Sequence, residues 1–377
     1  MGLDGYVVID ADGHGGEPLD WRERIPNRYR SQMEQFVARM KGLFGDLPGG
    51  AMQLDPAHST NRYVERPSNP LRFDPEGTRP GMFDPAPRIE DMDLEGIDVS
   101  IMFGGGAGEE WALLDPPFAA ALCTTLNDAR AEFCSFAPDR LKLNAKLPMI
   151  DPEAAAAELE RCVKTWPGIF VGMSTTQHVR DRNLDDRAYD VVWSTAETLG
   201  VAVSTHGGGQ AVDQIPYAIE RSNTRLEKHA ITHPFGSMLA VTNFTVGGIL
   251  HRFPNLRVGF MEAGVGWLPF WLQRLDEHYE LMPDQAPGID RLPSEYFKGR
   301  CFVSCEPDDP SVPYVCDTVG DDAVVYASDY CHFDCAFPES VRIVVDRDDL
   351  NASRKTAILG ANAARLYGLP LPATARS

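Results

Sequence analysis

Eight short runs of apolar residues recur along the chain, and most are followed by a stretch in which apolar residues have helical spacing. Short apolar runs bounded by turn-forming residues are typical of buried strands. The eight predicted strands cover residues 6–12, 98–103, 141–147, 168–173, 201–206, 256–262, 301–306 and 323–329. The predicted helices include residues 117–136, 152–165, 185–199 and 353–367.

This alternation of strands and helices predicts an α/β fold. Right-handed crossovers through the helices would make the strands parallel. Eight repeats favour closure into a (β/α)8 TIM barrel over an open sheet. The intervals 19–87 and 207–255, after the first and fifth strands, are too long for simple connections and are predicted to be loop and helical insertions. No linker or repeat divides the sequence, so we expect a single domain spanning residues 1–377.

The charge and composition exclude several classes of partner. The 377 residues carry a formal net charge of −20, which is not the basic footprint of a nucleic-acid-binding protein. A negative net charge also does not favour binding to an anionic membrane surface. No run reaches the roughly 18 apolar residues of a transmembrane helix. The eight scattered cysteines include no CxxC pair, and the first residues do not resemble a signal peptide. We expect a cytoplasmic protein that acts on a small molecule, without nucleic-acid or membrane partners.

Metal-binding residue types stand at the ends of three predicted strands. Asp12 and His14 close the first run, His206 the fifth and Asp329 the eighth. Residues i and i+2 of an extended segment point to the same side, so Asp12 and His14 can reach one ion. A parallel barrel brings strand ends together at its C-terminal face. These four residues are therefore predicted to be metal ligands.

Two imidazoles and two carboxylates suit a divalent transition metal better than an all-oxygen magnesium or calcium site. Zinc is the first choice, with iron, manganese or cobalt as alternatives. A catalytic metal keeps one position open for water. Asp10 lies deeper in the first strand and is expected to be a buried structural carboxylate. The competing interpretation is a set of polar strand ends capped by loops.

Several short motifs identify a wider likeness. They read DADGHGGEP at 10–18, EGIDV at 95–99, FPNLRV at 253–258, EAGVGWLP at 262–269, SDY at 328–330 and LGANAARL at 359–366. With them the chain resembles the amidohydrolase-related family, in the branch that includes aminocarboxymuconate-semialdehyde decarboxylase. The resemblance implies a distorted barrel with a metal at the strand ends. Carried over by position, the family's ligands fall on Asp12, His14, His206 and Asp329.

One position departs from the decarboxylase branch. There the sixth strand ends on a histidine that acts as an acid or base, whereas here it ends on Glu262. A carboxylate at this place could orient or deprotonate a metal-bound water, help hold a second metal, or be a buried group tied to loop amides. His233, in the long connection before the sixth strand, is an alternative acid or base, or a histidine that caps a helix.

Three further residues are expected to contact substrate. His332 follows Asp329 by three positions, Glu306 ends the seventh strand, and His178 follows the fourth. Each would face the same end of the barrel as the predicted ligands.

The first functional interpretation is a metal-dependent hydrolase. A metal-activated water would attack an amide, ester, thioester or activated C–C carbonyl. Asp329 would be both ligand and proton acceptor, while Glu262 or His233 would protonate the leaving group. The alternative is a metal-dependent nonoxidative decarboxylase of an aromatic or unsaturated acid. An alternative of another class is a noncatalytic binding barrel.

The segment from 253 to 279 carries more apolar side chains than one barrel helix needs. They are Phe260, Trp267, Phe270, Trp271, Leu272 and Tyr279. An exposed apolar patch often marks an interface, and the family resemblance implies a homodimer. The alternative is that these side chains pack the outside of the barrel.

Overall fold

The computed structural model describes residues 2–44, 79–104, 115–207, 222–330, 332 and 335–371. Eight strands form one parallel sheet in the order β1-β2-β3-β4-β7-β8-β9-β10. They are β1 (Ile9–His14), β2 (Val99–Phe103), β3 (Leu141–Lys146), β4 (Phe170–Thr175), β7 (Ala202–Thr205), β8 (Val258–Phe260), β9 (Cys301–Cys305) and β10 (Val324–Tyr326). Each strand overlaps one of the eight predicted runs.

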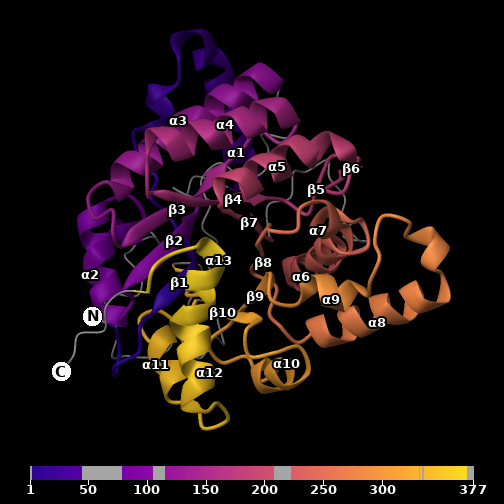
Figure 1. The fold of residues 1–377 in the computed structure, drawn as a ribbon. Coiled ribbons are helices and arrows are strands. Elements are labelled where there is room, and N and C mark those ends of the chain that lie inside the picture. Colours follow the sequence, from indigo (N-terminus) through magenta and orange to yellow (C-terminus); the bar gives the residue numbers. More distant parts are fainter. Residues whose placement is uncertain are drawn as a thin grey trace.

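The sheet curls until its first and last strands meet (Figure 1). Just beyond β10, the backbone N–H of Asp329 donates to the carbonyl of Asp12 at 3.0 Å. The N–H of His14 donates to the carbonyl of Tyr330 at 2.7 Å. These bonds join the C-terminal ends of the two strands and confirm the predicted (β/α)8 TIM barrel.

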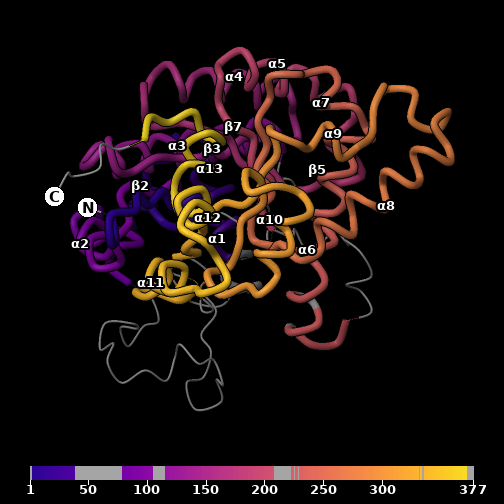
Figure 2. The backbone as a smooth tube through the Cα atoms, turned by 60° about the horizontal axis from the view of Figure 1, so that its bottom comes forward, coloured from indigo at the N-terminus to yellow at the C-terminus, as the bar shows by residue number. Residues whose placement is uncertain are grey.

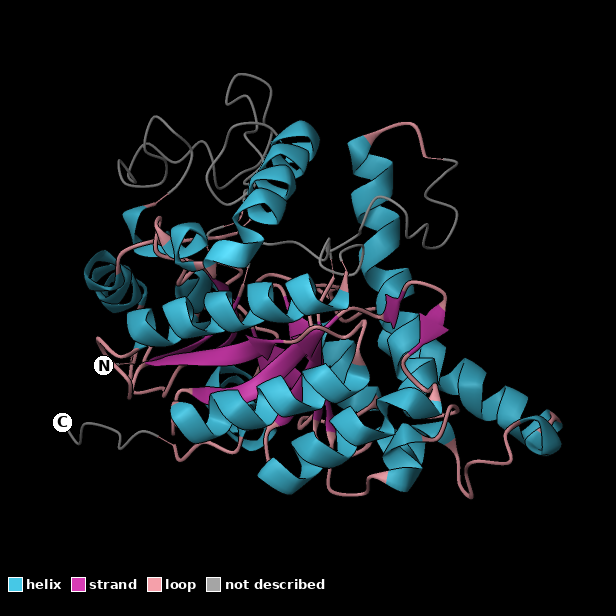
Figure 3. Ribbon diagram, turned by 90° about the horizontal axis from the view of Figure 1, so that it is seen from above, coloured by secondary structure: helices cyan, strands magenta, loops and turns pink. Residues whose placement is uncertain are grey.

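Helices cover the outside of the sheet (Figure 3). They include α2 (Pro85–Glu95), α3 (Pro116–Cys134), α4 (Pro152–Thr165), α5 (Asp190–Leu199), α6 (Arg225–Phe244), α8 (Leu268–Leu281), α9 (Pro293–Phe297), α10 (Val312–Thr318) and α11 (Ser340–Val345). Asp84, Asp115 and Asp151 each accept a backbone N–H at the start of α2, α3 and α4, and a proline follows each of them. An aspartate cap followed by proline favours a helix start, which explains why these boundaries can be predicted.

The C-terminal segment packs against side chains from the inside of the barrel. The predicted helix 353–367 is divided into α12 (Ala352–Thr356) and α13 (Asn362–Tyr367) by a π-helical turn. The phenol oxygen of Tyr367 donates to the carbonyl of Ala11 at 3.0 Å and lies 3.2 Å from Ser204 Oγ and 3.4 Å from Asn144 Nδ2. Those three residues come from β1, β7 and β3, which are not neighbours in the sheet. One side chain can reach all three only from the concave side.

The two predicted insertions are described in part. Residues 45–78 and 208–221 lie outside the described ranges, drawn in grey in Figure 2. The described part of 19–87 contains α1 (Arg30–Phe44) and three short 3-10 helices, and that of 207–255 contains α6 and α7 (Ile249–Arg252). A two-stranded ribbon, β5 (His178–Val179) and β6 (Arg182–Asn183), follows β4. Within the described ranges, no helix is both long and apolar enough to cross a membrane.

Candidate metal centre

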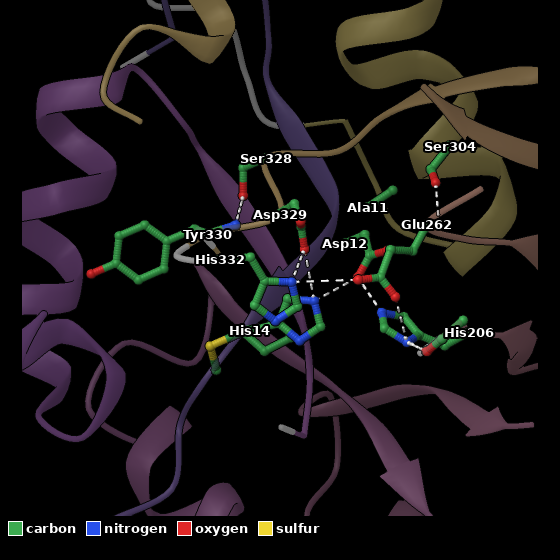
Figure 4. A network of polar contacts seen from close by, with 12 residues as sticks. Ala11, Asp12, His14, His206, Glu262, Ser304, Ser328, Asp329, Tyr330 and His332 are labelled. Carbon is green, nitrogen blue, oxygen red and sulfur yellow. Dashed lines mark hydrogen bonds and ion pairs between the residues drawn. The ribbon is translucent and has the colours of Figure 1, made fainter. Parts of the chain in front are cut away.

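The four predicted ligands lie at the C-terminal end of the barrel in two groups that share His14 (Figure 4). Asp12 and His206 belong to one group, and Asp329, with Glu262 and His332, belongs to the other. The Nε2 atom of His14 lies 3.0 Å from Asp329 Oδ1 and 3.7 Å from Asp12 Oδ1. The Nε2 atom of His206 lies 3.4 Å from the same Asp12 oxygen. The ends of three strands, far apart in sequence, therefore bring two imidazoles and two carboxylates close together, as the strand-end argument predicts.

The atoms that face one another lack hydrogen-bond partners. Among the buried side-chain atoms of the described residues, Asp12 Oδ1, His14 Nε2, His206 Nε2 and Asp329 Oδ1 are all unsatisfied. Buried polar atoms are rarely left unpaired, and a convergent group of them is suited to bind a cation. The residues present therefore fit a divalent metal.

The ring of His206 is oriented for this role. Its Nδ1 atom lies 2.8 Å from the carbonyl oxygen of Gly207 and 3.3 Å from Glu262 Oε2. An N–H on Nδ1 that donates to the Gly207 carbonyl leaves Nε2, which faces Asp12, available to bind a cation. Metal-binding histidines are commonly fixed in this way by a carbonyl or carboxylate behind the ring.

Burial and charge set the protonation of the site. Burial, with the charge of His332 nearby, lowers the pKa of His14 to about 4, so its imidazole is neutral at neutral pH. Burial raises the pKa of Asp12 to about 7. Burial alone would lower the pKa of His206, but the carboxylates of Glu262 and Asp12 outweigh it and raise the pKa to about 9. Protons on the histidines thus balance a surplus of carboxylates, and a cation would displace such protons.

Glu262 lies among three histidines. Its Oε2 atom is 3.3 Å from His206 Nδ1 and 3.5 Å from His233 Nε2, and its Oε1 atom is 3.4 Å from His332 Nδ1. Burial would raise the pKa of Glu262, but His206, His233 and His332 outweigh it and hold the pKa well below its usual value. The glutamate that replaces a histidine on the sixth strand is therefore an ionised carboxylate that gathers histidines from β7, α6 and the loop after β10.

His332 bridges this carboxylate and the ligand set. Its Nδ1 atom lies 2.8 Å from Asp329 Oδ1, and its ring stacks on His14 with 4.0 Å between centroids. Burial would lower the pKa of His332, but Asp329 and Glu262 outweigh it and hold the pKa well above its usual value. The side chain is 32% exposed, more than those of Glu262 or Asp329. A cationic imidazole therefore stands at the accessible side of the cluster.

Two other predicted residues lie apart from these contacts. The described contact of His178 Nδ1 is with the carbonyl of Arg180, 3.0 Å away in its own ribbon. Glu306 directly follows β9 and is exposed. Their predicted contact with substrate stays a prediction.

The structure also identifies supporting residues that the sequence did not single out. Ser304 accepts the backbone N–H of Glu262 at 2.9 Å, and the amide of Gln177 donates to the carbonyl of His206 at 3.0 Å. Asp10 accepts from the hydroxyls of Ser100 and Ser328, both at 2.8 Å, and so has the structural role expected of it.

The sequence profile of the amidohydrolase family matches residues 52–369, which is most of the chain. The chain belongs to the amidohydrolase family. This amidohydrolase is 27% identical to 2-amino-3-carboxymuconate-6-semialdehyde decarboxylase of Dictyostelium discoideum over 304 residues, 76% of this chain and 77% of the relative. It is 31% identical to gamma-resorcylate decarboxylase of a Polaromonas species over 202 residues, 50% of this chain and 58% of the relative.

Solved structures agree with the fold of this amidohydrolase. The 5-carboxyvanillate decarboxylase of Novosphingobium aromaticivorans, in complex with manganese and 4-hydroxy-3-methoxy-5-nitrobenzoic acid, aligns with a TM-score of 0.73 at 21% identity and covers 98% of each chain. A putative amidohydrolase from Staphylococcus aureus aligns with a TM-score of 0.63 at 26% identity over 75% of this chain and 91% of its own. The predicted resemblance to the branch that includes the decarboxylase is thereby confirmed, and the chain is an enzyme of the amidohydrolase superfamily.

Proposed function

We propose that this enzyme is a metal-dependent nonoxidative decarboxylase of an aromatic or unsaturated carboxylic acid. The observation that carries the proposal is the match to a decarboxylase over about three quarters of both chains. The shorter match to gamma-resorcylate decarboxylase supports the same chemistry. These relatives favour the decarboxylase alternative over the hydrolase interpretation of the sequence.

Asp12, His14, His206 and Asp329 would hold the metal. A bound divalent cation would fix the oxygens of the substrate and withdraw electron density from it. We propose manganese as the first ion to test, because two of the four ligands are carboxylates and manganese accompanies the ligand in the 5-carboxyvanillate decarboxylase structure. Zinc, the first choice from sequence, is the principal alternative.

Decarboxylation needs an acid that protonates carbon. The proton adds to the ring carbon that bears the carboxylate, the C–C bond then breaks, and its electron pair restores the ring as CO₂ leaves. His332 is the best-placed donor, because its imidazole is cationic and is the exposed member of the cluster. Glu262 and Asp329 hold its charge, and His233 occupies the other oxygen of Glu262.

The assignment of His332 as the acid explains how the reaction could proceed without a histidine at the end of the sixth strand. In the branch that the sequence resembles, a histidine stands at that strand end. Here Glu262 stands there, and the acid would come from the loop after β10. The hydrolase alternative is favoured by the same residue, because an ionised carboxylate is better suited to orient a water than to protonate carbon. A noncatalytic barrel is the least supported, since it leaves the convergent, unsatisfied ligand atoms without a purpose.

The test is a screen of the manganese- and zinc-loaded protein in deuterated water. Aromatic and unsaturated carboxylic acids are scored for CO₂ release and for deuterium at the vacated carbon. Amides, esters and thioesters are scored for hydrolysis with ¹⁸O-labelled water. Release of CO₂ with solvent deuterium on carbon is expected. Hydrolysis products that contain ¹⁸O, with no CO₂ from any acid, would replace the proposal with the hydrolase alternative.

A further inference from the structure

The residue after Asp329 is held at every polar atom. The backbone N–H of Tyr330 donates to Ser328 Oγ at 3.1 Å, and its carbonyl accepts the N–H of His14 at 2.7 Å. Its phenol donates to the carboxylate of Asp91 in α2. Figure 4 shows the ring directed away from the side chains of Asp12, His14, His206 and Asp329.

Two arginines, Arg79 and Arg88, complete the set of residues that surround the Tyr330 side chain. Arg79 donates to Asp91 through Nε at 2.9 Å and also through Nη2. Arg88 lies over the Tyr330 ring, 4.0 Å from its centroid, and donates to the carbonyl of His14 at 3.0 Å. Tyr330, Asp91, Arg79 and Arg88 are all less than 9% exposed. Ion pairs this deep are costly to assemble, so their position beside two ligand-bearing strands calls for an explanation.

The backbone conformation of Asp329 explains why these buried ion pairs lie beside the ligand-bearing strands. Its φ is 49°, a conformation that a residue with a side chain holds only when its surroundings enforce it. The N–H of Asp329 is bonded to Asp12, and the next residue is fixed at its N–H, carbonyl, ring and hydroxyl. Loss of one of these restraints would let residue 329 relax and carry its carboxylate away from His14.

The geometry points to Tyr330 as a positioning residue for the metal centre, with its phenol bound to the Asp91–Arg79 pair as the restraint that aims Asp329. The inference rests on the metal site of the proposed function and adds to it residues of α2 and of the segment before it. Outer residues that hold a ligand typically change metal affinity by about 10- to 100-fold when altered.

The close approach of Gly81 to the Tyr330 phenol is independent evidence that the position of the phenol is restricted. A Cβ at Gly81 would lie 2.5 Å from the phenol oxygen of Tyr330 and 3.0 Å from the Cα of Arg88. The backbone before α2 therefore approaches the phenol as closely as the absence of a side chain allows. Gly81→Ala should displace the phenol without removing any of its partners.

The test compares Tyr330→Phe with Tyr326→Phe. Tyr326 lies in β10, is equally buried, and donates or accepts through its hydroxyl only with Ser340 among the described partners, away from the ligands. Each variant loses one buried phenol oxygen from the same strand region and should lose similar stability in a thermal melt. Manganese dissociation constants are measured by competition with a fluorescent chelator, and the Mn²⁺ electron paramagnetic resonance spectrum is recorded.

We expect Tyr330→Phe and Gly81→Ala to weaken manganese binding by about tenfold or more and to change the spectrum, and Tyr326→Phe to do neither. Equal manganese affinity in Tyr330→Phe and Tyr326→Phe would overturn the inference. Because the titration uses no substrate, this outcome leaves the decarboxylase proposal standing, and failure of the activity screen leaves the affinity comparison valid.

Discussion

Glu262 and Asp329 are two of the four residues other than glycine with positive φ in the described chain, at 56° and 49°. Each such residue costs on the order of 1–3 kcal/mol. Each lies two or three residues after the end of a barrel strand, and both carry a carboxylate into the same cluster. Strain at two converging acidic residues, with the backbone of one anchored by Ser304 and of the other by Asp12, indicates that their directions matter to function.

The ligand assignment makes a direct prediction. Purified wild-type protein should hold about one equivalent of transition metal, and the double variant Asp12→Ala, His206→Ala should hold none, because half of the donor atoms are gone. Elemental analysis of the dialysed proteins measures this. His178→Ala is the control, since His178 bonds within its own ribbon. Full occupancy in the double variant would refute the assignment.

Glu262 gives a second prediction. Glu262→Gln removes the charge that holds His332 and His233 while keeping nearly the same shape, so turnover should fall by about 10²-fold or more, the scale of lost acid–base catalysis. Metal content should stay unchanged if Glu262 acts on the histidines alone. Parallel loss of metal and activity would instead make Glu262 a ligand, because its carboxylate also lies within reach of an ion shared with His14, Asp329 and His332.

For individual residues, the sequence predicts the positions that the ends of strands determine. The proximity of the four proposed ligands could be predicted because Asp12, His14, His206 and Asp329 each stand at or near the end of an apolar run, and a barrel brings such ends together. The contact of Glu262 with His233 could not be found, because it depends on where α6 lies over the barrel. Arg88 and Asp91 gave no signal either, since charged residues on a helix usually face solvent.

At the scale of elements, β1 shows how one strand separates Asp10 from Asp12 and His14, as expected from the sequence. The pairing of β1 with β2 shifts register between Asp10 and Gly13. Asp12 and His14 reach the ligand cluster, whereas Asp10 turns to Ser100 and Ser328. A Cβ at Gly13 would lie 2.6 Å from Asp10 Oδ2 and 2.7 Å from Ser100 Oγ, so the pairing of these two side chains leaves no room for a side chain at this position. A register shift of this kind leaves no mark in an apolar pattern.

The contact between α2 and α11 makes a prediction about pH. Glu95 ends α2 and accepts from Ser340, which begins α11. Burial raises the pKa of Glu95 from 4.5 to about 7. Its folded form binds a proton more tightly than the unfolded chain does, so its contribution to stability is complete at low pH and is lost as the pH rises from about 4.5 to 7.

Glu95→Gln should remove this loss of stability at higher pH. Relative to wild type, the variant should gain up to about 3 kcal/mol in free energy of unfolding between pH 5 and pH 8, since one pKa unit corresponds to about 1.4 kcal/mol. Urea titrations at the two pH values measure the difference. Glu90→Gln, exposed on the same helix, is the control and should follow wild type. A Glu95→Gln profile parallel to wild type would contradict the assigned pKa.

At the scale of the whole molecule, the barrel accounts for part of the apolar surplus in residues 253–279. Phe260 and Leu272 are buried, and Trp271 donates through Nε1 to the carbonyl of Met238 in α6 at 2.8 Å. This packing is the alternative to an interface. Phe270 remains, 58% exposed on α8, the helix that extends from one side of the body (Figures 1 and 2). The homodimer is therefore still a prediction, and it now depends on a smaller surface.

That surface can be tested with a matched pair of substitutions. Phe270 and Phe136 are equally exposed at 58%, but Phe136 follows α3, in another part of the barrel wall. If α8 forms a dimer contact, Phe270→Glu should place a charge in an apolar interface and yield monomers, whereas Phe136→Glu should keep the wild-type mass. Multi-angle light scattering over a hundredfold range of concentration measures this. A monomeric wild type throughout that range would show that the exposed phenylalanine on α8 is an ordinary surface residue, as single exposed apolar side chains usually are.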